Sequence, residues 1–440
     1  MTQPKRFLFA VWDGGGCVPP LLSMAGALVT RGHDVRILAD PVLEPEVAAV
    51  GADFRPWRSA PHRVTRGVSS SEVVRDWEAK TPFGGFALIR DRLICGPAAD
   101  FARDVLGELD RHPADVVVPD CLLLGVAVAA EARDIPVAFS VSNVLPLPRP
   151  GVPPFGAGLK PARGPLGRAR DSALGFATAR LWARGLPALN AARIGLGLAA
   201  LQSPFDQFAR AERLLVLTSA AFDYPSFPIP ANARYVGPRL EDPSWAHEWT
   251  APWPSDDARP LVLVGLSSTY QDQLPVVQRI ATALGRLPVR GLITVGPAVS
   301  ADAIAAPENV AVVASAPHGA VLPKASAVIT HAGHGTVIKA LAAGVPLVCL
   351  PMGRDQDDTA ARAVLTGCGV RLKPSASVRA IAAATETVLA DTRYRAAAEA
   401  MATVIADDVR SDRAVDELEA LAQRARPTSS PRTPSGAGLG

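Results

Sequence analysis

Residues 331–358 of this 440-residue chain read HAGHGTVIKALAAGVPLVCLPMGRDQDD, and the pattern of this stretch decides the fold. Just before it, Ala327–Thr330 is short, β-branched and apolar, which is typical of a buried parallel strand. A glycine-rich turn at His331–Thr336 leads into Val337–Ala343, whose alanine and leucine content predicts a helix. Glycine and proline end that helix, and Leu347–Leu350 is a second strand. This order of strand, turn, helix and strand indicates an α/β domain with parallel strands.

The turn between the first strand and the helix suits a phosphate group. Glycines such as Gly333 and Gly335 let backbone N–H groups approach an anion closely, and the N-terminus of a helix favours negative charge. His331 can donate a hydrogen bond to a phosphate oxygen, and Thr336 either caps the helix or contacts the phosphate. His334 either assists them or faces solvent. We therefore predict a diphosphate site at this helix N-terminus.

The polar cluster after the second strand suits a polyol. Asp355 can accept hydrogen bonds from sugar hydroxyls, and the amide of Gln356 can both donate and accept them. In the alternative interpretation, residues 355–358 only cap the predicted helix Thr359–Leu365, because acidic residues favour the N-terminal end of a helix. A ligand that carries both a diphosphate and a polyol is a nucleotide sugar. The two features on one α/β unit therefore predict a nucleotide-sugar site.

The whole segment resembles the donor-binding signature of the UDP-glycosyltransferase superfamily, particularly the bacterial natural-product glycosyltransferases of the macrolide type. That pattern runs His-x-Gly-x-Gly-Thr, an Ala-Leu helix, Gly-Val-Pro, a short strand, and Pro followed by Asp-Gln. The resemblance implies a GT-B fold, in which two Rossmann-like α/β domains face each other across a cleft. The donor would lie on the C-terminal domain and the acceptor on the N-terminal domain. It also implies inversion at the anomeric carbon with no metal requirement.

Three hydroxyl residues follow Leu261–Gly265, the first strand predicted for the C-terminal domain. Members of the family place hydroxyl side chains near the diphosphate at this point, so the resemblance implies donor contacts here. The alternative is that one of them caps the next helix. These residues are Ser267, Ser268 and Thr269.

Residues 309–318 resemble the segment that holds the nucleobase in the family, which implies contacts from Ser315 and His318. Relatives commonly carry tryptophan at the position of Ser315, where it stacks on the base. The glutamate that binds the ribose hydroxyls in the family is replaced here by Lys339, which cannot accept hydrogen bonds. The donor nucleotide is therefore left open between UDP and dTDP, whose pentose lacks the 2′-hydroxyl.

The N-terminal half begins with the same order of strand, turn, helix and strand. Phe7–Val11 is predicted as a strand, a glycine-rich turn follows, Leu21–Thr30 is a helix and Val35–Leu38 is the next strand. Val116–Val118 and Val137–Ser140 repeat the motif, with a helix between them. We therefore predict a Rossmann-like acceptor domain at 1–240, an interdomain linker at 241–260, a nucleotide-sugar domain at 261–426 and a disordered tail at 427–440.

The usual catalytic base of the family is absent from this chain. Many relatives carry Gly-His-Val in the first turn, with an aspartate that orients the histidine; here Cys17 replaces the histidine and Asp120 corresponds to the aspartate. A thiol is mostly protonated at neutral pH, so we interpret Cys17 as a packing residue. Asp13 and Asp120 follow predicted strands at the cleft, and burial could raise the pKa of either carboxyl towards neutrality. Asp13 is our first choice as base or acceptor anchor, although aspartate is also common in turns.

Composition and charge argue against several other classes of protein. A net charge of +3, without a basic tract or an aromatic platform, argues against nucleic acid as a partner. The five scattered cysteines, without a CxxC pair, argue for reduced thiols in the cytoplasm and against a zinc site. We expect neither a signal sequence nor a membrane span. The oligomeric state is open between a monomer and a homodimer.

The leading hypothesis is therefore an inverting, metal-independent glycosyltransferase with no cofactor besides its nucleotide-sugar substrate. It would move a sugar from a UDP or dTDP donor to a small apolar acceptor, as in antibiotic tailoring. The alternatives are a GT-B sugar-nucleotide epimerase and a non-catalytic relative that activates a partner glycosyltransferase. The intact Asp355-Gln356 pair argues against the epimerase, and a complete donor site argues against the accessory protein.

Overall fold

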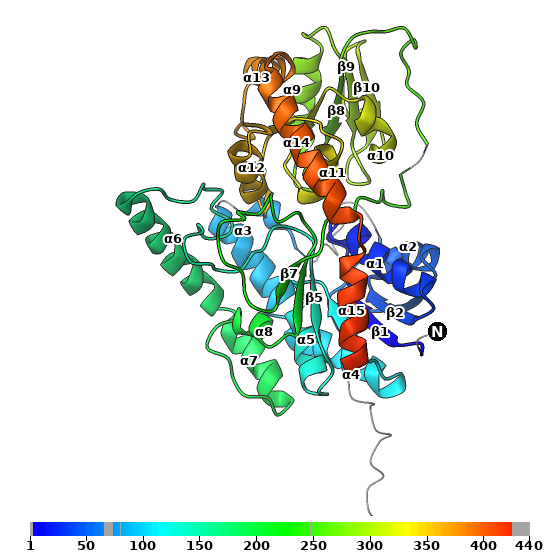
Figure 1. Cartoon of the computed structure of the whole chain (residues 1–440), viewed down its shortest axis with the longest axis vertical. Coiled ribbons are helices and arrows are strands. Elements are labelled where there is room, and N and C mark those ends of the chain that lie inside the picture. The colour runs from blue at the N-terminus through cyan, green and yellow to red at the C-terminus, as the bar shows by residue number, and fades with distance from the viewer. Residues whose placement is uncertain (1–2, 66–73, 80, 247, 425–440) are drawn as a thin grey trace, which may run out of the picture.

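The computed structural model describes residues 3–65, 74–79, 81–246 and 248–424, and it consists of two α/β halves (Figure 1). The predicted tail at 427–440 lies outside the described residues. In the N-terminal half, the sheet β3-β2-β1-β4 continues into the sheet β5-β6-β7 through parallel bridges from Val117 to Val137 and from Asp120 to Ser140. The strands are β1 Arg6–Ala10, β2 Asp34–Ala39, β3 Asp53–Pro56, β4 Val116–Pro119, β5 Ala138–Val141, β6 Arg213–Val216 and β7 Ala233–Tyr235.

The C-terminal half has one parallel sheet with the strand order β10-β9-β8-β11-β12-β13. The order reverses between β8 and β11, and ligands of such open α/β sheets bind beyond the carboxyl ends of the strands at this point. The strand registers place Gly265 beside Thr330, directly before the predicted phosphate turn. The strands are β8 Leu261–Gly265, β9 Arg290–Thr294, β10 Val310–Val313, β11 Ala327–Thr330, β12 Leu347–Cys349 and β13 Gly369–Arg371.

Helices flank both sheets, and three of them begin three residues earlier than predicted: α1, α11 and, at Gln356, α12. α1 begins at Val18 because proline fits the first turn of a helix, where its missing N–H has no partner to lose. α11 begins at His334, directly after Gly333 as N-cap. None of the described helices is long and apolar enough to cross a bilayer. The helices of the N-terminal half are α1 Val18–Thr30, α2 Glu44–Ala49, α3 Pro82–Ile89, α4 Ala98–Arg111, α5 Leu124–Glu131, α6 Pro165–Ala183, α7 Leu186–Gly195 and α8 Asp206–Ala209; those that follow are α9 Leu274–Leu284, α10 His318–Val321, α11 His334–Ala342, α12 Gln356–Leu365, α13 Val378–Ala390, α14 Thr392–Val409 and α15 Arg413–Arg424.

One buried carboxylate joins the two halves. Asp223, in the N-terminal half, accepts hydrogen bonds from Nε and Nη2 of Arg362 on α12 at 2.9 and 2.6 Å. Arg149 and Tyr235 donate to the same carboxylate at 3.0 and 2.9 Å. Burial opposes the ionised form, but the two arginines lower the pKa of Asp223 below its usual value. The ion pair therefore orients α12, and with it the predicted sugar-binding residue Asp355, relative to the N-terminal half.

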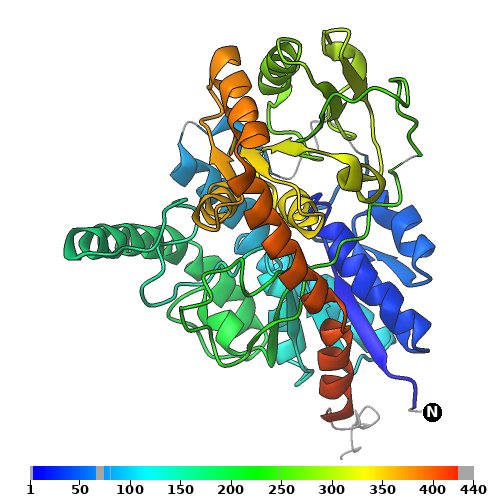
Figure 2. The same ribbon diagram turned by 45° about the horizontal axis from the view of Figure 1, so that its top comes forward.

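The last helix packs with the N-terminal half, which differs from the predicted domain end at residue 426. α14 runs down from the C-terminal half, and α15 lies beside α1 (Figures 1 and 2). Glu419 on α15 pairs with Arg31 at the end of α1, at 2.8 Å. The amphipathic pattern of α15 predicts a helix, but it does not specify which sheet the apolar face covers. That face joins the core of β1, α1 and β2, and it consists of Ala414, Val415, Leu418, Leu421 and Ala422.

We predict that Leu418→Ala destabilises the N-terminal half, although the residue lies at the far end of the chain. Leu418 is fully buried, so the substitution removes apolar contacts and leaves a cavity at a cost of about 2–5 kcal/mol. Chemical unfolding measures the loss, and amide hydrogen exchange should show it in β1, α1 and β2. Val404→Ala on the exposed face of α14 is the control, with an expected change within about 0.5 kcal/mol. Loss of protection confined to the C-terminal sheet would contradict the assignment of α15.

Candidate active site

A cavity of about 1570 Å³ lies between the two halves, at the carboxyl ends of both parallel sheets. This is the position at which doubly wound α/β sheets bind ligands. Every site residue predicted from the sequence lines it. From the N-terminal half these are Asp13 and Asp120, and from the C-terminal half Ser267, Ser268, Thr269, Ser315, His318, His331, Gly333, His334, Gly335, Thr336, Asp355 and Gln356.

The predicted phosphate turn is built around the ring of His331. Ala332 has a positive φ of 67°, which is uncommon for a residue with a side chain and reverses the chain tightly after β11. A Cβ atom on Gly333 would lie 2.5 Å from Nε2 of His331, so the ring and the glycine pack against each other. α11 then begins at His334, and the first N–H groups of a helix have no partner within the helix. These groups face the cavity as ready donors for an anion.

Three histidines surround this turn, and burial makes all of them neutral at pH 7. Burial lowers the pKa of His331 to about 4, against a smaller opposing effect of the Gly265 carbonyl. It likewise lowers the pKa of His318 and of His334 to about 4. Nε2 of His334 lies 2.9 Å from Oγ1 of Thr218 in the N-terminal half, so His334 does not face solvent. The histidines therefore contribute hydrogen bonds rather than positive charge to this site.

The hydroxyl cluster after β8 does not cap the next helix. α9 begins at Leu274 with Gln273 at its N-cap position, several residues beyond Thr269. Instead, Oγ1 of Thr269 lies 3.1 Å from Oγ of Ser267 and accepts a hydrogen bond from Nη1 of Arg354 at 2.8 Å. The hydroxyl groups therefore form part of the cavity wall beside the phosphate turn.

Arg354 is a site residue that the sequence analysis did not assign. Its guanidinium binds both carboxylate oxygens of Asp76 at 2.8 Å. This contact brings a segment of the N-terminal half over the wall that the C-terminal half contributes to the cavity, called the donor wall below. Beside it, Trp77 packs edge-on against Tyr270, with ring centroids 5.2 Å apart. The signal for Arg354 was its position directly before Asp355. Its partner lies 278 positions away in the chain, and no local pattern identifies such a contact.

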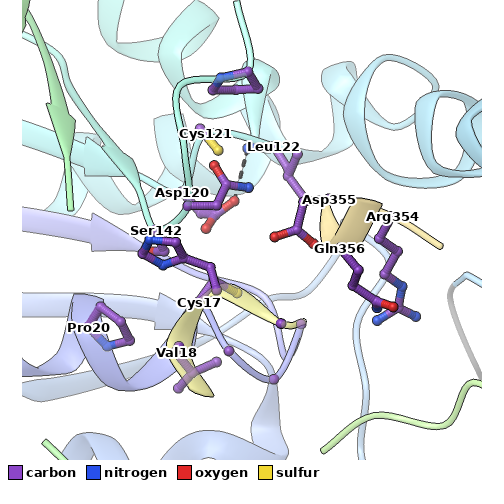
Figure 3. Close-up of a pocket in the computed structure, with 18 of the residues that line it drawn as sticks. Cys17, Val18, Pro20, Asp120, Cys121, Leu122, Ser142, Arg354, Asp355 and Gln356 are labelled. Atoms are coloured by element: carbon purple, nitrogen blue, oxygen red, sulfur yellow. Dashed lines mark hydrogen bonds between the residues drawn. The ribbon is translucent and has the colours of Figure 1, made fainter. Parts of the chain in front are cut away.

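The predicted sugar-binding pair occupies the start of α12. Asp355 holds the N-cap position without a side-chain capping hydrogen bond, and Asp357 and Asp358 lie in the first turn, where the helix dipole favours acidic residues. Figure 3 shows its carboxylate pointing towards Asp120 across the pocket. Burial raises the pKa of Asp355. The amide of Gln356 accepts from the Met352 N–H at 2.7 Å and donates to Gln271 at 2.8 Å, and these bonds hold the loop before α12 in place.

On the facing wall, Cys17 and Asp120 form a pair (Figure 3). Cys17 is at the N-cap position of α1, and Asp120 follows β4. Burial raises the pKa of Asp120 to about 6, although a hydrogen bond from the Leu122 N–H and the nearby Cys17 thiol favour its ionised form; the thiol donates to the Trp12 carbonyl at 3.8 Å. Burial, and then the charge of Asp120, raise the pKa of Cys17 well above its usual value. The thiol is therefore a hydrogen-bond donor at neutral pH and not a base.

Asp13 is held by a separate polar network. Its backbone N–H donates to the Asp40 carboxylate, and its own carboxylate lies 3.5 Å from Nη1 of Arg63. The side chains of Asp13 and Arg63 are both more than nine-tenths buried. Burial raises the pKa of Asp40 to about 7. Asp13 thus lines the cavity as one partner of a buried ion pair with Arg63.

The chain is similar to enzymes that build natural products. Residues 279–421 match the family described as erythromycin biosynthesis protein CIII-like, C-terminal domain. The chain is 32% identical over 429 residues to 4′-demethylrebeccamycin synthase of Lentzea aerocolonigenes, and the match covers 94% of this chain and 99% of that protein. The chain belongs to the natural-product glycosyltransferases.

Solved structures of other glycosyltransferases share the arrangement of the two halves. The calicheamicin glycosyltransferase superposes with a TM-score of 0.73 at 23% identity, covering 97% of this chain and 100% of that one. A spinosyn rhamnosyltransferase complexed with thymidine diphosphate superposes with a TM-score of 0.65 at 19% identity, covering 94% and 100%. These likenesses confirm the predicted GT-B fold.

We predict that Gly333→Ala destabilises the enzyme whereas Gly335→Ala does not. A methyl group on Gly333 would force the buried His331 ring out of its position, and such overpacking costs about 1–3 kcal/mol. A methyl group on Gly335 meets no atom within 4 Å, and alanine is favoured over glycine inside a helix by about 0.5–1 kcal/mol. Thermal unfolding of the two variants measures the difference. Equal melting temperatures would contradict the packing of His331 against Gly333.

Proposed function

We propose that this glycosyltransferase moves a sugar with inversion from a UDP or dTDP donor to a small apolar acceptor. The observation that carries the proposal is the position of Asp120. This buried carboxyl, with its pKa raised to about 6, faces Asp355 from the opposite wall of the cavity (Figure 3). A base on one wall and a diphosphate site on the other match an in-line displacement at a sugar held between them.

The donor assignment is supported by the C-terminal wall. The N–H groups at the start of α11 and the hydroxyl groups of Ser267 and Thr269 suit a diphosphate, and Asp355 suits sugar hydroxyls. The structure of a spinosyn rhamnosyltransferase holds thymidine diphosphate, which favours the dTDP alternative.

The acceptor assignment is supported by the opposite wall, which is largely apolar. A cavity lined by hydrophobic and aromatic side chains with a few polar groups suits a small, mostly apolar molecule. Residues along one side of α6 line this wall, and so do residues of the loop before α6. Representative apolar side chains are Phe86, Ile89, Leu122, Leu124, Phe155 and Trp182.

In the proposed step, the Asp120 carboxylate takes the proton from the nucleophilic group of the acceptor. That group forms a bond to the anomeric carbon while the bond from this carbon to the diphosphate oxygen breaks. The electron pair leaves with the diphosphate, whose charge is stabilised by the N–H groups at the start of α11. Because attack and departure occur on opposite faces, the configuration of the anomeric carbon inverts. The step as drawn uses these groups alone, without a metal or another cofactor.

Asp120 replaces Asp13 as our first choice for the base. Asp13 is engaged with the buried Arg63, and this pair has a structural role in the first turn. Asp120 is buried, which raises its pKa towards neutrality, and the hydrogen bond from the Leu122 N–H fixes its orientation. General-base catalysis works best when the pKa of the base lies near the working pH.

We predict that Asp120→Asn lowers kcat by about 10²- to 10⁴-fold, because an amide cannot accept the proton. Donor binding, measured by calorimetry, should be unchanged.

In the unaltered enzyme, kcat/KM should fall about tenfold per pH unit below a pH of about 6, since a protonated Asp120 is no longer a base. Cys17→Ala removes the thiol that favours the ionised form of Asp120 and should shift this limb to higher pH. A profile that is flat down to pH 4.5 would reject Asp120 as the base.

We also predict that Asp355→Ala abolishes transfer and leaves the fold intact. The substitution removes the acceptor for the sugar hydroxyls, while the N-cap position loses no capping bond. Initial rates with UDP- and dTDP-sugars, together with thermal unfolding, measure both effects. Asp357→Ala is the matched control, because Asp357, in the first turn of the same helix, pairs with Arg371 on β13 and does not line the cavity. Near-normal turnover in Asp355→Ala would remove the sugar site from this position.

A further inference from the structure

The donor cavity extends along α11, beyond the phosphate turn. A Cβ atom on Gly265 would lie 2.9 Å from the ring of His318 and 3.3 Å from Cγ2 of Thr336, so these three residues meet at the base of the turn. Nε2 of His318 lies 3.1 Å from Oγ1 of Thr294, at the end of β9. If the diphosphate binds at the start of α11 and the sugar lies towards Asp355, the nucleoside extends in this other direction.

One turn further along α11, the interdomain linker reaches the cavity. Lys339 lies three residues after Thr336, about 4.5 Å further along the axis. Its Nζ binds Oδ1 of Asp242 at 2.8 Å, and Oδ2 of Asp242 accepts from the Gly319 N–H at 2.8 Å. Asp242 belongs to the linker, so these bonds fix the linker against α11 and the start of α10. Both side chains also line the cavity.

The same linker segment contributes an aromatic residue to the wall of the cavity. Trp245 is half-buried and lines the cavity, and its backbone carbonyl accepts a hydrogen bond from Oγ of Ser315 at 3.4 Å. A turn closed by the Ala246 N–H and the Pro243 carbonyl at 2.9 Å holds the segment in shape. Of the other large aromatic side chains in the cavity wall, Tyr270 packs against Trp77, and the remainder come from the N-terminal half.

We propose that Trp245 is the surface on which the nucleobase of the donor stacks. Asp242, held by Lys339 and Gly319, then lies beside the pentose, where its carboxylate oxygens keep lone pairs for a hydroxyl. The nucleoside site is thus assembled from the linker and not from the C-terminal domain alone. This assignment rests on the proposed nucleotide-sugar donor. It also makes donor affinity depend on how the linker is seated.

The assignment is tested by calorimetry on the full chain with dTDP, UDP and inorganic pyrophosphate. Loss of stacking on one base typically weakens binding about 5- to 100-fold. We expect Trp245→Ala to weaken dTDP and UDP binding by a factor in this range and to leave pyrophosphate binding unchanged. Trp245→Phe retains an aromatic face and should recover most of the affinity.

Trp249→Ala is the matched control within the same linker. Trp249 is half-buried against Trp253, with ring centroids 6.3 Å apart, and it is not among the described residues that line the cavity. The Trp249→Ala variant should bind dTDP and UDP with the affinity of the unaltered enzyme. Equal nucleotide affinity of Trp245→Ala and the unaltered enzyme would overturn the assignment, as would an equal loss for pyrophosphate. If the unaltered enzyme binds pyrophosphate but neither nucleotide, the proposed donor itself fails.

Discussion

The geometry of the active site depends on the buried ion pair between Asp223 and Arg362. It joins a loop of the N-terminal half to the helix that begins just after Asp355, and both side chains are almost completely shielded from water. Removing one partner of such a pair leaves an uncompensated buried charge, which typically costs about 3–5 kcal/mol. The ring of Tyr224 also lies 4.0 Å from the Arg362 guanidinium. These contacts set the distance and angle at which the two walls of the cavity face each other.

The relative orientation of the two halves also determines what the replacement of the family histidine by Cys17 does to the site. Cys17 stays protonated because it is buried next to Asp120, so the carboxylate and not the thiol is the basic group of this pair. Asp120 faces the donor wall because β4 ends there and the bond from Leu122 holds the carboxylate in the loop that follows. The histidines of the donor wall are neutral for the same reason of burial. The protonation states of these side chains therefore depend on their burial between the two halves.

The interface also explains why several site residues escape a reading of the sequence. The signature 331–358 has a regular spacing of glycines and apolar residues, and it identified the phosphate turn and Asp355 correctly as lining one cavity. Arg354 and Asp76 carry no such spacing, because they meet across the cleft from segments 278 positions apart. Trp245 lies in a proline-rich linker, where composition predicts only an irregular path. The apolar face of α15 was visible as a pattern, but the sheet that it covers was not.

By itself, the sequence determined the parallel α/β architecture, the family and most of the polar residues that the C-terminal half contributes to the cavity. These features depend on apolar periodicity, glycine turns and helix ends. Such patterns lie within a few tens of residues of the chain, so they can be recognised in the sequence. Only the tertiary structure decided that α15 completes the N-terminal core, that Asp13 pairs with the buried Arg63, and that the linker reaches α11 through Asp242 and Lys339. Each of these depends on burial and on charges brought together from distant segments. Such contacts form only when the chain has folded, so the sequence pattern does not show them.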